Sequence, residues 1–231
     1  MELVRKKILI SGASSGIGKA TALRFAQEGW DVCLNARREE LLMQIKTTLP
    51  AGNHMVCAGD YSDPAVAQRI AEQIARTWGG LDALANCAGI FSPGHAIDQP
   101  LDDWRYVLDL MLYGGVQLTR LAVPLMRDGG RIIHVTSIHG ERAEAGAASY
   151  SMAKAALNQY CRSLAVELAD KGILVNAVAP GFVDTPMSMV NGVNELESEW
   201  FRKNYAEGHH LPLRRAGRPE EIAGVIWFLA G

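Results

Sequence analysis

The sequence predicts an α/β protein with one doubly wound domain, in which a parallel sheet carries helices on both faces. Three observations lead to this class. Short β-branched runs alternate with longer segments whose apolar residues recur at three- and four-residue steps. The short runs are almost continuously apolar, which is typical of strands covered on both faces. A glycine-rich turn, Gly12-Ala-Ser-Ser-Gly16-Ile-Gly18, joins the first run to the first helical segment.

The elements follow one another in a regular order. Six strands are expected, at Lys7–Ser11, Asp31–Asn35, Met55–Asp60, Leu81–Asn86, Arg131–Thr136 and Ile173–Ala177. Five helices are expected between them, at Gly16–Gly29, Glu39–Leu49, Pro64–Trp78, Asp102–Met126 and Ser149–Lys171. Right-handed crossovers place the carboxyl ends of parallel strands, and with them a ligand crevice, at one edge of the sheet.

The segment Pro186–Gly208 interrupts this alternation. It mixes apolar and aromatic residues with polar ones and has no strand pattern. Insertions of this kind often cover a site, so we expect a substrate lid at about 186–210. No linker or repeat is visible, and the whole chain, 1–231, is expected to form a single domain.

Composition excludes several classes of protein. The chain has 231 residues, 48% of them hydrophobic, and a formal net charge of −2. A general nucleic-acid binder usually has a basic surface, so no nucleic-acid partner is expected. No apolar run approaches the ~20 residues that span a bilayer. The first residues lead straight into a strand and leave no room for a signal peptide. We therefore expect a cytoplasmic protein without a membrane partner.

The four cysteines, Cys33, Cys57, Cys87 and Cys161, have no metal-ligand spacing. We expect them to be reduced and mostly buried, as small apolar side chains. No metal site is expected.

The glycine-rich turn is a candidate phosphate site. Glycine is needed where the backbone turns sharply and where a phosphate approaches main-chain N–H groups. The spacing is G-x3-G-x-G, which differs from the G-x-G-x-x-G fingerprint of many dinucleotide sites. A plain strand-to-helix turn is the alternative, but the position at the first strand–helix junction favours a nucleotide.

The end of the second strand bears on the choice of cofactor. Asn35-Ala36-Arg37-Arg38 has no acid that would accept a hydrogen bond from a ribose 2′-hydroxyl. A guanidinium there suits a 2′-phosphate, so NADP(H) is favoured over NAD(H). The alternative is that the two arginines only solvate the start of the next helix, beside Glu39 and Glu40.

Polar residues also end the third and fourth strands. Asp60 ends the third, and Asn86-Cys-Ala-Gly89 ends the fourth, so these groups are expected at the crevice. Asp60 either accepts a hydrogen bond from an adenine amino group or caps an Asx turn. The sequence favours neither.

The chemistry is expected from Tyr150-Ser-Met-Ala-Lys154, because residues at i and i+4 share a helix face. An ammonium beside a phenol favours the phenolate and lowers its pKa toward neutrality, as a general acid/base at pH 7 requires. The alternative is a surface pair with a partly buried ring. Ser137 ends the fifth strand and could donate a hydrogen bond to a substrate oxygen. The neighbouring hydroxyl, Thr136, is expected on the opposite face.

The segments around these groups hint at the substrate. The apolar lid and Phe91 indicate a partly apolar molecule. Polar contacts near Ser137 could come from the loop residues His95, His139, Glu141 and Arg142, which otherwise belong to the loop surface.

These motifs, together with Pro180-Gly181-Phe-Val-Asp-Thr185, occur in one order and with one set of gaps along nearly the whole chain. In this combination the sequence resembles the classical short-chain dehydrogenases/reductases. Residues 1–20 and 131–185 also resemble 3-oxoacyl-carrier-protein reductases and sugar or polyol dehydrogenases. The resemblance implies a Rossmann-like fold and hydride transfer between NADP(H) and a small-molecule carbonyl or secondary alcohol.

The resemblance also implies a role for each matching residue. Tyr150 passes a proton to or from the substrate oxygen, Lys154 holds the nicotinamide ribose and lowers the pKa of Tyr150, and Ser137 polarises the carbonyl. The implied cofactor contacts are Gly12, Ser14, Ser15 and Ile17 at the pyrophosphate and adenosine ribose, Arg37 and Arg38 at the 2′-phosphate, Asp60 and Tyr61 at adenine, Asn86 and Gly89 on the adenosine side, and Pro180, Gly181, Val183 and Thr185 at the nicotinamide carboxamide.

Two features depart from the family pattern. Met111 stands where the family usually has an asparagine that helps to hold a water chain to the lysine. A thioether cannot donate a hydrogen bond, so the proton relay is expected to be rerouted, slowed or absent. The chain also stops at Trp227-Phe-Leu-Ala-Gly231, where family members continue into a last strand. That strand is therefore expected to be missing.

Three questions stay open at this point. We expect a homo-oligomer, a tetramer or dimer, with Asp102–Met126 and Ser149–Lys171 as candidate faces. Met111 motivates an alternative in which the chain binds NADP(H) as a non-catalytic sensor or scaffold. A sugar-nucleotide epimerase or dehydratase also has Tyr-x3-Lys, but its glycine spacing usually differs and its chain is longer.

Overall fold

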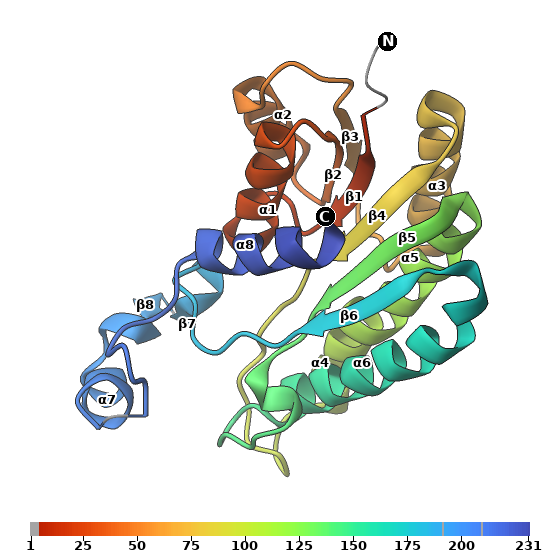
Figure 1. The fold of residues 1–231 in the computed structure, drawn as a ribbon. Coiled ribbons are helices and arrows are strands. Elements are labelled where there is room, and N and C mark those ends of the chain that lie inside the picture. Colours follow the sequence, from red (N-terminus) through yellow and green to blue (C-terminus); the bar gives the residue numbers. More distant parts are fainter. Residues whose placement is uncertain (1–4, 191, 209) are drawn as a thin grey trace.

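The expected sheet is confirmed. The computed structural model describes residues 5–190, 192–208 and 210–231. Its main sheet has six parallel strands in the order β3-β2-β1-β4-β5-β6 (Figure 1). Their bounds are Lys7–Ser11 for β1, Asp31–Ala36 for β2, Met55–Ala58 for β3, Leu81–Asn86 for β4, Met126–Val135 for β5 and Leu174–Val178 for β6. The order reverses between β1 and β4, which is where ligands bind in doubly wound sheets.

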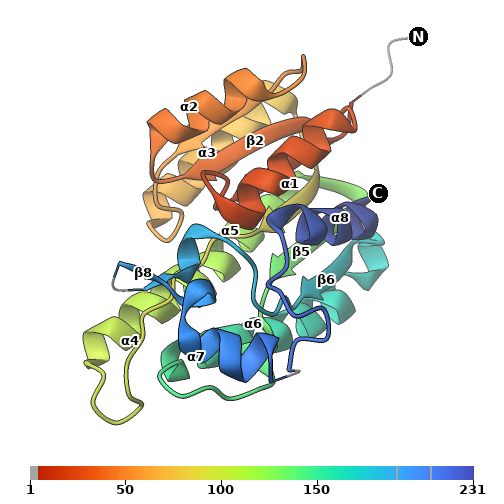
Figure 2. The same ribbon diagram turned by 90° about the vertical axis from the view of Figure 1, so that its left-hand side faces the viewer.

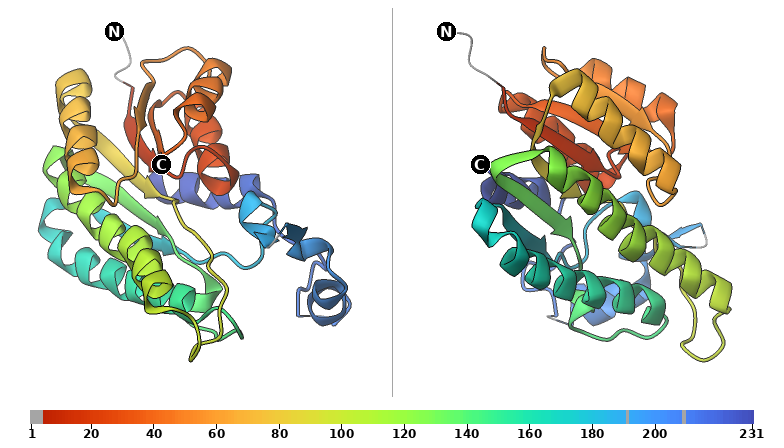
Figure 3. Two further views of the ribbon diagram at one scale, coloured as in Figure 1. Left: turned by 180° about the vertical axis from the view of Figure 1, so that it is seen from behind. Right: turned by 90° about the vertical axis from the view of Figure 1, so that its right-hand side faces the viewer.

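Helices cover both faces of the sheet (Figures 1 and 3). One face packs against α1 (Gly16–Gln27), α2 (Glu39–Thr48) and α8 (Pro219–Ala230). The other packs against α3 (Pro64–Trp78), α5 (Gly114–Ala122) and α6 (Ala148–Glu167), and α4 (Leu101–Leu108) continues the line of α5.

Side-chain alternation in β1 explains why both faces need cover. Ile8 and Ile10 enter one core cluster with Phe25 of α1, whereas Leu9 enters the other with Ile70 of α3. Successive side chains of a strand point to opposite faces, so a strand buried on both sides is apolar throughout.

The helix expected at Asp102–Met126 is wrong as a single element. It divides into α4, a π-helical segment at Asp109–Tyr113, α5 and a 3-10 turn at Val123–Leu125. Strand β5 then begins at Met126, earlier than expected. A π-helical turn holds one extra residue, which hardly changes an apolar pattern read over two or three turns. The segment packs against α6.

The remaining boundaries differ by smaller amounts. Strand β3 ends at Ala58, before Asp60, and α6 is followed by a separate 3-10 turn at Ala169–Lys171. Helix α8 was not among the expected elements, although its proline at the first position is a common start signal.

The segment expected as a lid lies beyond the carboxyl ends of the strands (Figure 2). It contains a 3-10 turn at Pro186–Ser188, the short strands β7 (Met189–Val190) and β8 (Val193–Asn194), a 3-10 turn at Glu195–Glu197, α7 (Glu199–Phe201) and a π-helical turn at Arg202–Ala206. The segment has no strand pattern in its sequence, yet β7 and β8 pair antiparallel. Positions 191 and 209 of the expected range lie outside the described residues.

Two expected absences concern the described residues alone. None of their helices is long and apolar enough to cross a membrane. Within the same residues, no group of three or more histidine, cysteine or acidic side chains has the arrangement of a metal site. The four cysteines are free thiols, and Cys87 is the least buried of them.

Candidate active site

The glycine-rich turn has a geometry that larger residues could not adopt. Gly12 and Gly16 have φ of +68° and +51°, in the left-handed region. A Cβ on Gly18 would meet the carbonyl oxygen of Gly12 closer than any contact allows, and one on Gly12 would lie 2.7 Å from Cα of Ala88. The amide of Ala13 donates to the carbonyl of Asn35, which ties the turn to the end of β2.

The turn directs the N-terminus of α1 into the crevice. Ser15 is the N-cap residue, yet its side chain makes no capping hydrogen bond, and the first turn of the helix contains no acid. The first amides of the helix therefore keep their hydrogen-bonding capacity, and the helix dipole favours an anion there. These residues fit a dinucleotide pyrophosphate.

Arg37 and Arg38 extend over the same pocket and do not pair with the acids next to them. Arg38 donates to the Ser14 hydroxyl at 3.3 Å, and Arg37 donates to the Tyr106 hydroxyl at 3.0 Å. No ion pair to Glu39 or Glu40 forms in the part of the chain that the structure describes. Both guanidiniums are exposed, so they are available to a phosphate.

Asp60 and Tyr61 line the pocket, but their polar groups already have partners. Oδ1 of Asp60 accepts from the amide of Ser62 at 3.0 Å and from its hydroxyl at 2.7 Å, which is an Asx turn. The Tyr61 hydroxyl is buried and donates to the carbonyl of Leu110. Of the two readings left open for Asp60, the structure contains the turn. A contact to adenine would use its remaining oxygen.

Asn86 is the one expected cofactor contact that does not line the pocket. It is 3% exposed and belongs to a buried chain of hydrogen bonds. Ser11 donates to its Oδ1 at 2.5 Å, and its Nδ2 donates to Nδ1 of His134 at 3.3 Å. The Ser11 hydroxyl also accepts from the amide of Ala88. Asn86 thus acts on the pocket wall through Ser11.

The chain of hydrogen bonds fixes the protonation state of His134. Since Nδ1 accepts from Asn86, Nε2 carries the proton and donates to Thr119, which in turn donates to the carbonyl of Gly115. Burial, with a smaller contribution from the charge of Lys154, lowers the pKa of His134 to about 4. A second proton on this ring has no acceptor here.

Acidification is therefore expected to destabilise the fold through His134. Its folded pKa lies below the ordinary value near 6.5, so the unfolded chain binds the proton first, and stability falls as pH drops from about 6.5 toward 4. Between pH 7.5 and 5.0 the loss from this group is about 2 kcal/mol. Urea unfolding at the two pH values measures it.

The matched variant is His134→Gln, which can hydrogen-bond but does not titrate. Its free energy of unfolding should lose about 2 kcal/mol less over the same interval, whatever its value at pH 7.5. An equal loss in both proteins would show that His134 does not carry the effect.

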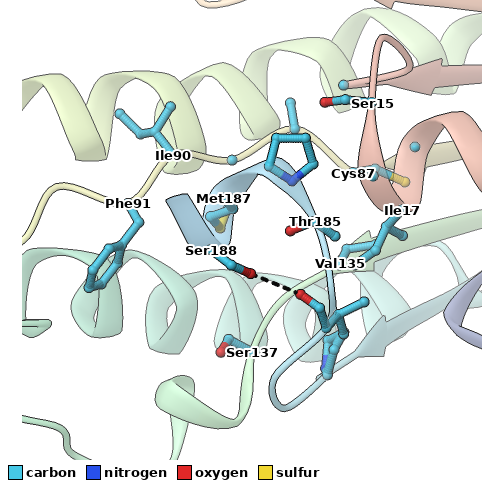
Figure 4. Close-up of a pocket in the computed structure, with 18 of the residues that line it drawn as sticks. Ser15, Ile17, Cys87, Ile90, Phe91, Val135, Ser137, Thr185, Met187 and Ser188 are labelled. Carbon is cyan, nitrogen blue, oxygen red and sulfur yellow. Dashed lines mark hydrogen bonds between the residues drawn. The ribbon is translucent and has the colours of Figure 1, made fainter. Parts of the chain in front are cut away.

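The second half of the site adjoins the first in one pocket of about 470 Å³. Except for Asn86, every expected site residue lines it, namely Gly12, Ser14, Ser15, Ile17, Arg37, Arg38, Asp60, Tyr61, Gly89, Ser137, Tyr150, Lys154, Pro180, Gly181, Val183 and Thr185. Figure 4 shows Ser15, Ile17 and Cys87 at one end and Phe91 and Ser137 toward the other. One cavity therefore joins the phosphate-binding turn to the Tyr–Lys pair.

Tyr150 and Lys154 are buried, so they do not form a surface pair. Tyr150 is 9% exposed and Lys154 is 3% exposed. The ammonium of Lys154 lies 5.5 Å from the centre of the Tyr150 ring and donates to the carbonyl of Val135 at 2.8 Å. Ser137 is 5% exposed, and its Oγ accepts from the amide of His139.

The expected lowering of the Tyr150 pKa by Lys154 is wrong. Burial raises the pKa of Tyr150, and only a hydrogen bond with Ser137 acts in the opposite direction. Burial also lowers the pKa of Lys154 to about 8, which weakens its charge as a partner. A low dielectric disfavours the charged form of both groups, and the ammonium of Lys154 donates to Val135.

Met111 lies in the π-helical segment and is 1% exposed. Its sulfur and the ammonium of Lys154 both face Gly89, because a Cβ built there would lie 3.5 Å from one and 3.6 Å from the other. Met111 thus lies near Lys154, where its replacement of the family's asparagine was expected to affect the proton relay.

The loop after β6 encloses the pocket from another side. Ser188 donates to the carbonyl of Val183 at 3.3 Å, the dashed line in Figure 4. A Cβ on Gly16 would meet Thr185 at 3.0 Å, so this loop packs directly on the glycine-rich turn.

The substrate end contains residues that the sequence analysis missed. Of the four candidate polar residues, His139 lines the pocket, whereas His95, Glu141 and Arg142 do not. Glu144 and Glu195 line it as well and were not expected. Phe91 lies edge-on to Tyr150, with ring centres 5.6 Å apart, as expected for a partly apolar pocket. The only feature of the sequence that could have identified Glu144 as a pocket residue is its position in the loop between Ser137 and Tyr150.

Comparison with known proteins agrees with this geometry. The family described as "Enoyl-(Acyl carrier protein) reductase" matches residues 12–231. A glucose 1-dehydrogenase of Gluconobacter oxydans is 37% identical, over 97% of this chain and 85% of its own length. A 3-oxoacyl-[acyl-carrier-protein] reductase of Thermotoga maritima is 36% identical, over 100% and 92%. A short-chain dehydrogenase of Burkholderia cenocepacia, solved in complex with NADP, superposes with a TM-score of 0.84 at 29% identity, covering 98% of this chain and 90% of that one.

Proposed function

The chain belongs to the classical short-chain dehydrogenase/reductase family, an NAD(P)-dependent oxidoreductase acting on CH–OH groups, and we propose that it is an NADP(H)-dependent carbonyl reductase or secondary-alcohol dehydrogenase with Tyr150 as general acid/base. The observation that carries the proposal is the single pocket that joins the glycine-rich turn, the two arginines and the Ser137–Tyr150–Lys154 group.

The nicotinamide, when bound, supplies or accepts the hydride, and the protein contributes orientation and proton transfer. Ser137 and Tyr150 both line the pocket, and interaction with Ser137 lowers the pKa of Tyr150 against the larger effect of burial. In reduction, a carbonyl oxygen between them accepts from both hydroxyls, and Tyr150 gives up its proton as negative charge develops on that oxygen. Lys154, fixed by Val135, contributes positive charge beside the ring.

A further part of the proposal concerns the segment 186–208, excluding position 191. Met187, Ser188, Glu195 and Leu196 line the substrate end of the pocket. We assign this segment as a substrate lid, because it closes one side of the cavity and comes from a connection rather than from the sheet.

We also propose an assembly and a location for the protein. Apolar side chains such as Tyr113 and Met152 are exposed on the helices facing away from the sheet, which supports a homo-oligomer through the α4–α5 and α6 surfaces. The four free thiols fit a reducing compartment, so we place the protein in the cytoplasm.

A 2′-phosphate is expected to bind the two arginines, and Arg37→Asp should shift preference from NADPH toward NADH. The substitution removes a charge-assisted hydrogen bond to the 2′-phosphate and puts a carboxylate in its place. The ratio of the dissociation constants of NADPH and NADH should therefore change about 100-fold. Arg38→Asp should act in the same direction, since Arg38 lies over Ser14. Fluorescence titration with each cofactor measures the ratio.

The control is Arg76→Asp, which makes the same change of charge on α3, outside the pocket. The ratio of the dissociation constants of NADPH and NADH should be the same in this variant as in wild type. An unchanged ratio in both Arg37→Asp and Arg38→Asp would refute the arginine assignment.

A second function is favoured by one observation. Met111, buried beside Gly89 and Lys154, motivates a protein that binds NADP(H) without turnover. Steady oxidation of NADPH with a panel of ketones and aldehydes separates the two functions, since the non-catalytic protein binds cofactor and shows no dependence on the carbonyl.

A further inference from the structure

The substrate end of the pocket contains a hydrogen-bonded group that proton transfer does not use. Glu144, in the loop between Ser137 and Tyr150, pairs with His139 through Nε2 at 3.0 Å. Its other oxygen accepts from the Tyr205 hydroxyl at 3.3 Å. Burial is partial, since the side chains of His139 and Glu144 are 16% and 21% exposed. The carboxylate is held in place and still reaches the cavity.

The carboxylate is connected to the reacting group through His139. The His139 ring is edge-on to the Tyr150 ring, with centres 6.2 Å apart, and both residues line the cavity together with Glu144. Each carboxylate oxygen accepts two hydrogen bonds, and each has one partner in the protein, so acceptor capacity remains on the side facing the substrate.

Aromatic rings fix the orientation of this group. Phe182 packs on Tyr205 with ring centres 4.5 Å apart and on His139 at 6.4 Å. Phe201 of the lid packs on Phe182 at 5.1 Å. An acceptor held by neighbours on two sides loses little entropy when a ligand donates to it.

A second carboxylate gives this end of the pocket its charge. Glu195 lines the cavity from the lid, and burial together with the charge of Glu144 raises its pKa. No lysine or arginine lines this end, among the described residues, apart from Lys154 beside Tyr150. The wall therefore accepts hydrogen bonds and repels anions.

Resting on the proposed function, we propose that Glu144, oriented by His139 and Tyr205, accepts a hydrogen bond from a hydroxyl next to the reacting carbon, so that the enzyme acts on neutral hydroxylated carbonyls and polyols. A substrate without that hydroxyl shields the carboxylate from water and leaves its second acceptor position unfilled, and sites built to hydrogen-bond a substrate hydroxyl discriminate strongly against analogues that lack it.

Hydroxyacetone and 2-butanone test the proposal, because they differ by a hydroxyl in place of a methyl group. The readout is the ratio of kcat/KM for hydroxyacetone to that for 2-butanone with NADPH. The two ketones differ in intrinsic reactivity, but this difference drops out when the ratio in a variant is compared with the ratio in wild type. Glu144→Gln keeps one acceptor oxygen and should lower the ratio about tenfold, and Glu144→Leu, with none, about 100-fold.

The matched control is Glu141→Gln, an exposed glutamate in the same loop that does not line the pocket, and its ratio should equal that of wild type. A constant ratio in both Glu144 variants overturns the proposal. The proposal is also overturned if the ratio falls in Glu195→Gln but not in the Glu144 variants, because the hydroxyl would then be recognised by the lid. Absence of turnover across the whole panel of ketones and aldehydes in wild type refutes the proposed function, and this inference with it. Turnover on the panel without turnover of hydroxyacetone, or with a ratio that is unchanged in the Glu144 variants, refutes this inference alone.

Discussion

Replacing Tyr150 by phenylalanine should lower kcat for carbonyl reduction by about 10²- to 10⁴-fold, the usual contribution of a positioned general acid. The ring stays, so its packing against Phe91 and His139 is kept and only the hydroxyl is lost. The dissociation constant of NADPH should change little, because the turn and the two arginines that carry its phosphates are untouched. Rates of NADPH oxidation and a separate NADPH titration give the two quantities.

Tyr160→Phe is the matched control. Tyr160 lies on the same helix and is partly buried, but it packs on His134 and is not part of the pocket. Its kcat should stay within a few-fold of wild type. If Tyr150→Phe turns over as fast as Tyr160→Phe, the proton comes from another group. If neither wild type nor variant turns over while both bind NADPH, the protein is a non-catalytic binder.

Gly18→Ala is expected to have the largest effect on cofactor binding for the smallest change in side chain. The added Cβ would lie 2.7 Å from the carbonyl carbon of Gly12 and 3.1 Å from the amide nitrogen of Ala13. These are backbone atoms of the turn and cannot rotate away. The turn must open, which should cost about 1–3 kcal/mol of folding free energy and weaken NADPH binding about tenfold or more.

Gly224→Ala in α8 separates this clash from a general effect of alanine. Its Cβ meets nothing within 4 Å, so the substitution should stabilise the helix by about 0.5–1 kcal/mol and leave NADPH affinity unchanged. Unfolding in urea and titration with NADPH should thus move in opposite directions for the two variants. Equal NADPH affinity in Gly18→Ala and wild type would show that the phosphates bind elsewhere.

Most of the fold could be predicted from the sequence because its signals are local. Apolar runs such as Lys7–Ser11 and the glycines of the first turn depend on residues close in the chain, and the structure places them as expected. The π-helical segment Asp109–Tyr113, which packs against α6, could not be predicted, since one extra residue in a turn hardly changes the apolar pattern.

The site divides in the same way. Ser137, Tyr150 and Lys154 carry a motif, and they converge in one pocket. The pKa of Tyr150 could not be predicted from spacing alone, because burial, which a sequence does not show, outweighs the lysine. Asn86 was expected at the cofactor, but its direction depends on Ser11 and His134 from neighbouring strands. Glu144 has no motif and becomes visible only through its contacts.

The aromatic packing of the lid gives the protein a built-in optical reporter. Trp200 is 52% exposed, and its ring centre lies 5.3 Å from that of Tyr205, whose hydroxyl contacts Glu144. Any ligand that rearranges Tyr205 changes the surroundings of this indole, and so the wavelength and yield of its emission. Reduced nicotinamide absorbs where indoles emit, so excitation energy passing from Trp200 to the dinucleotide would follow lid and cofactor together without an added dye.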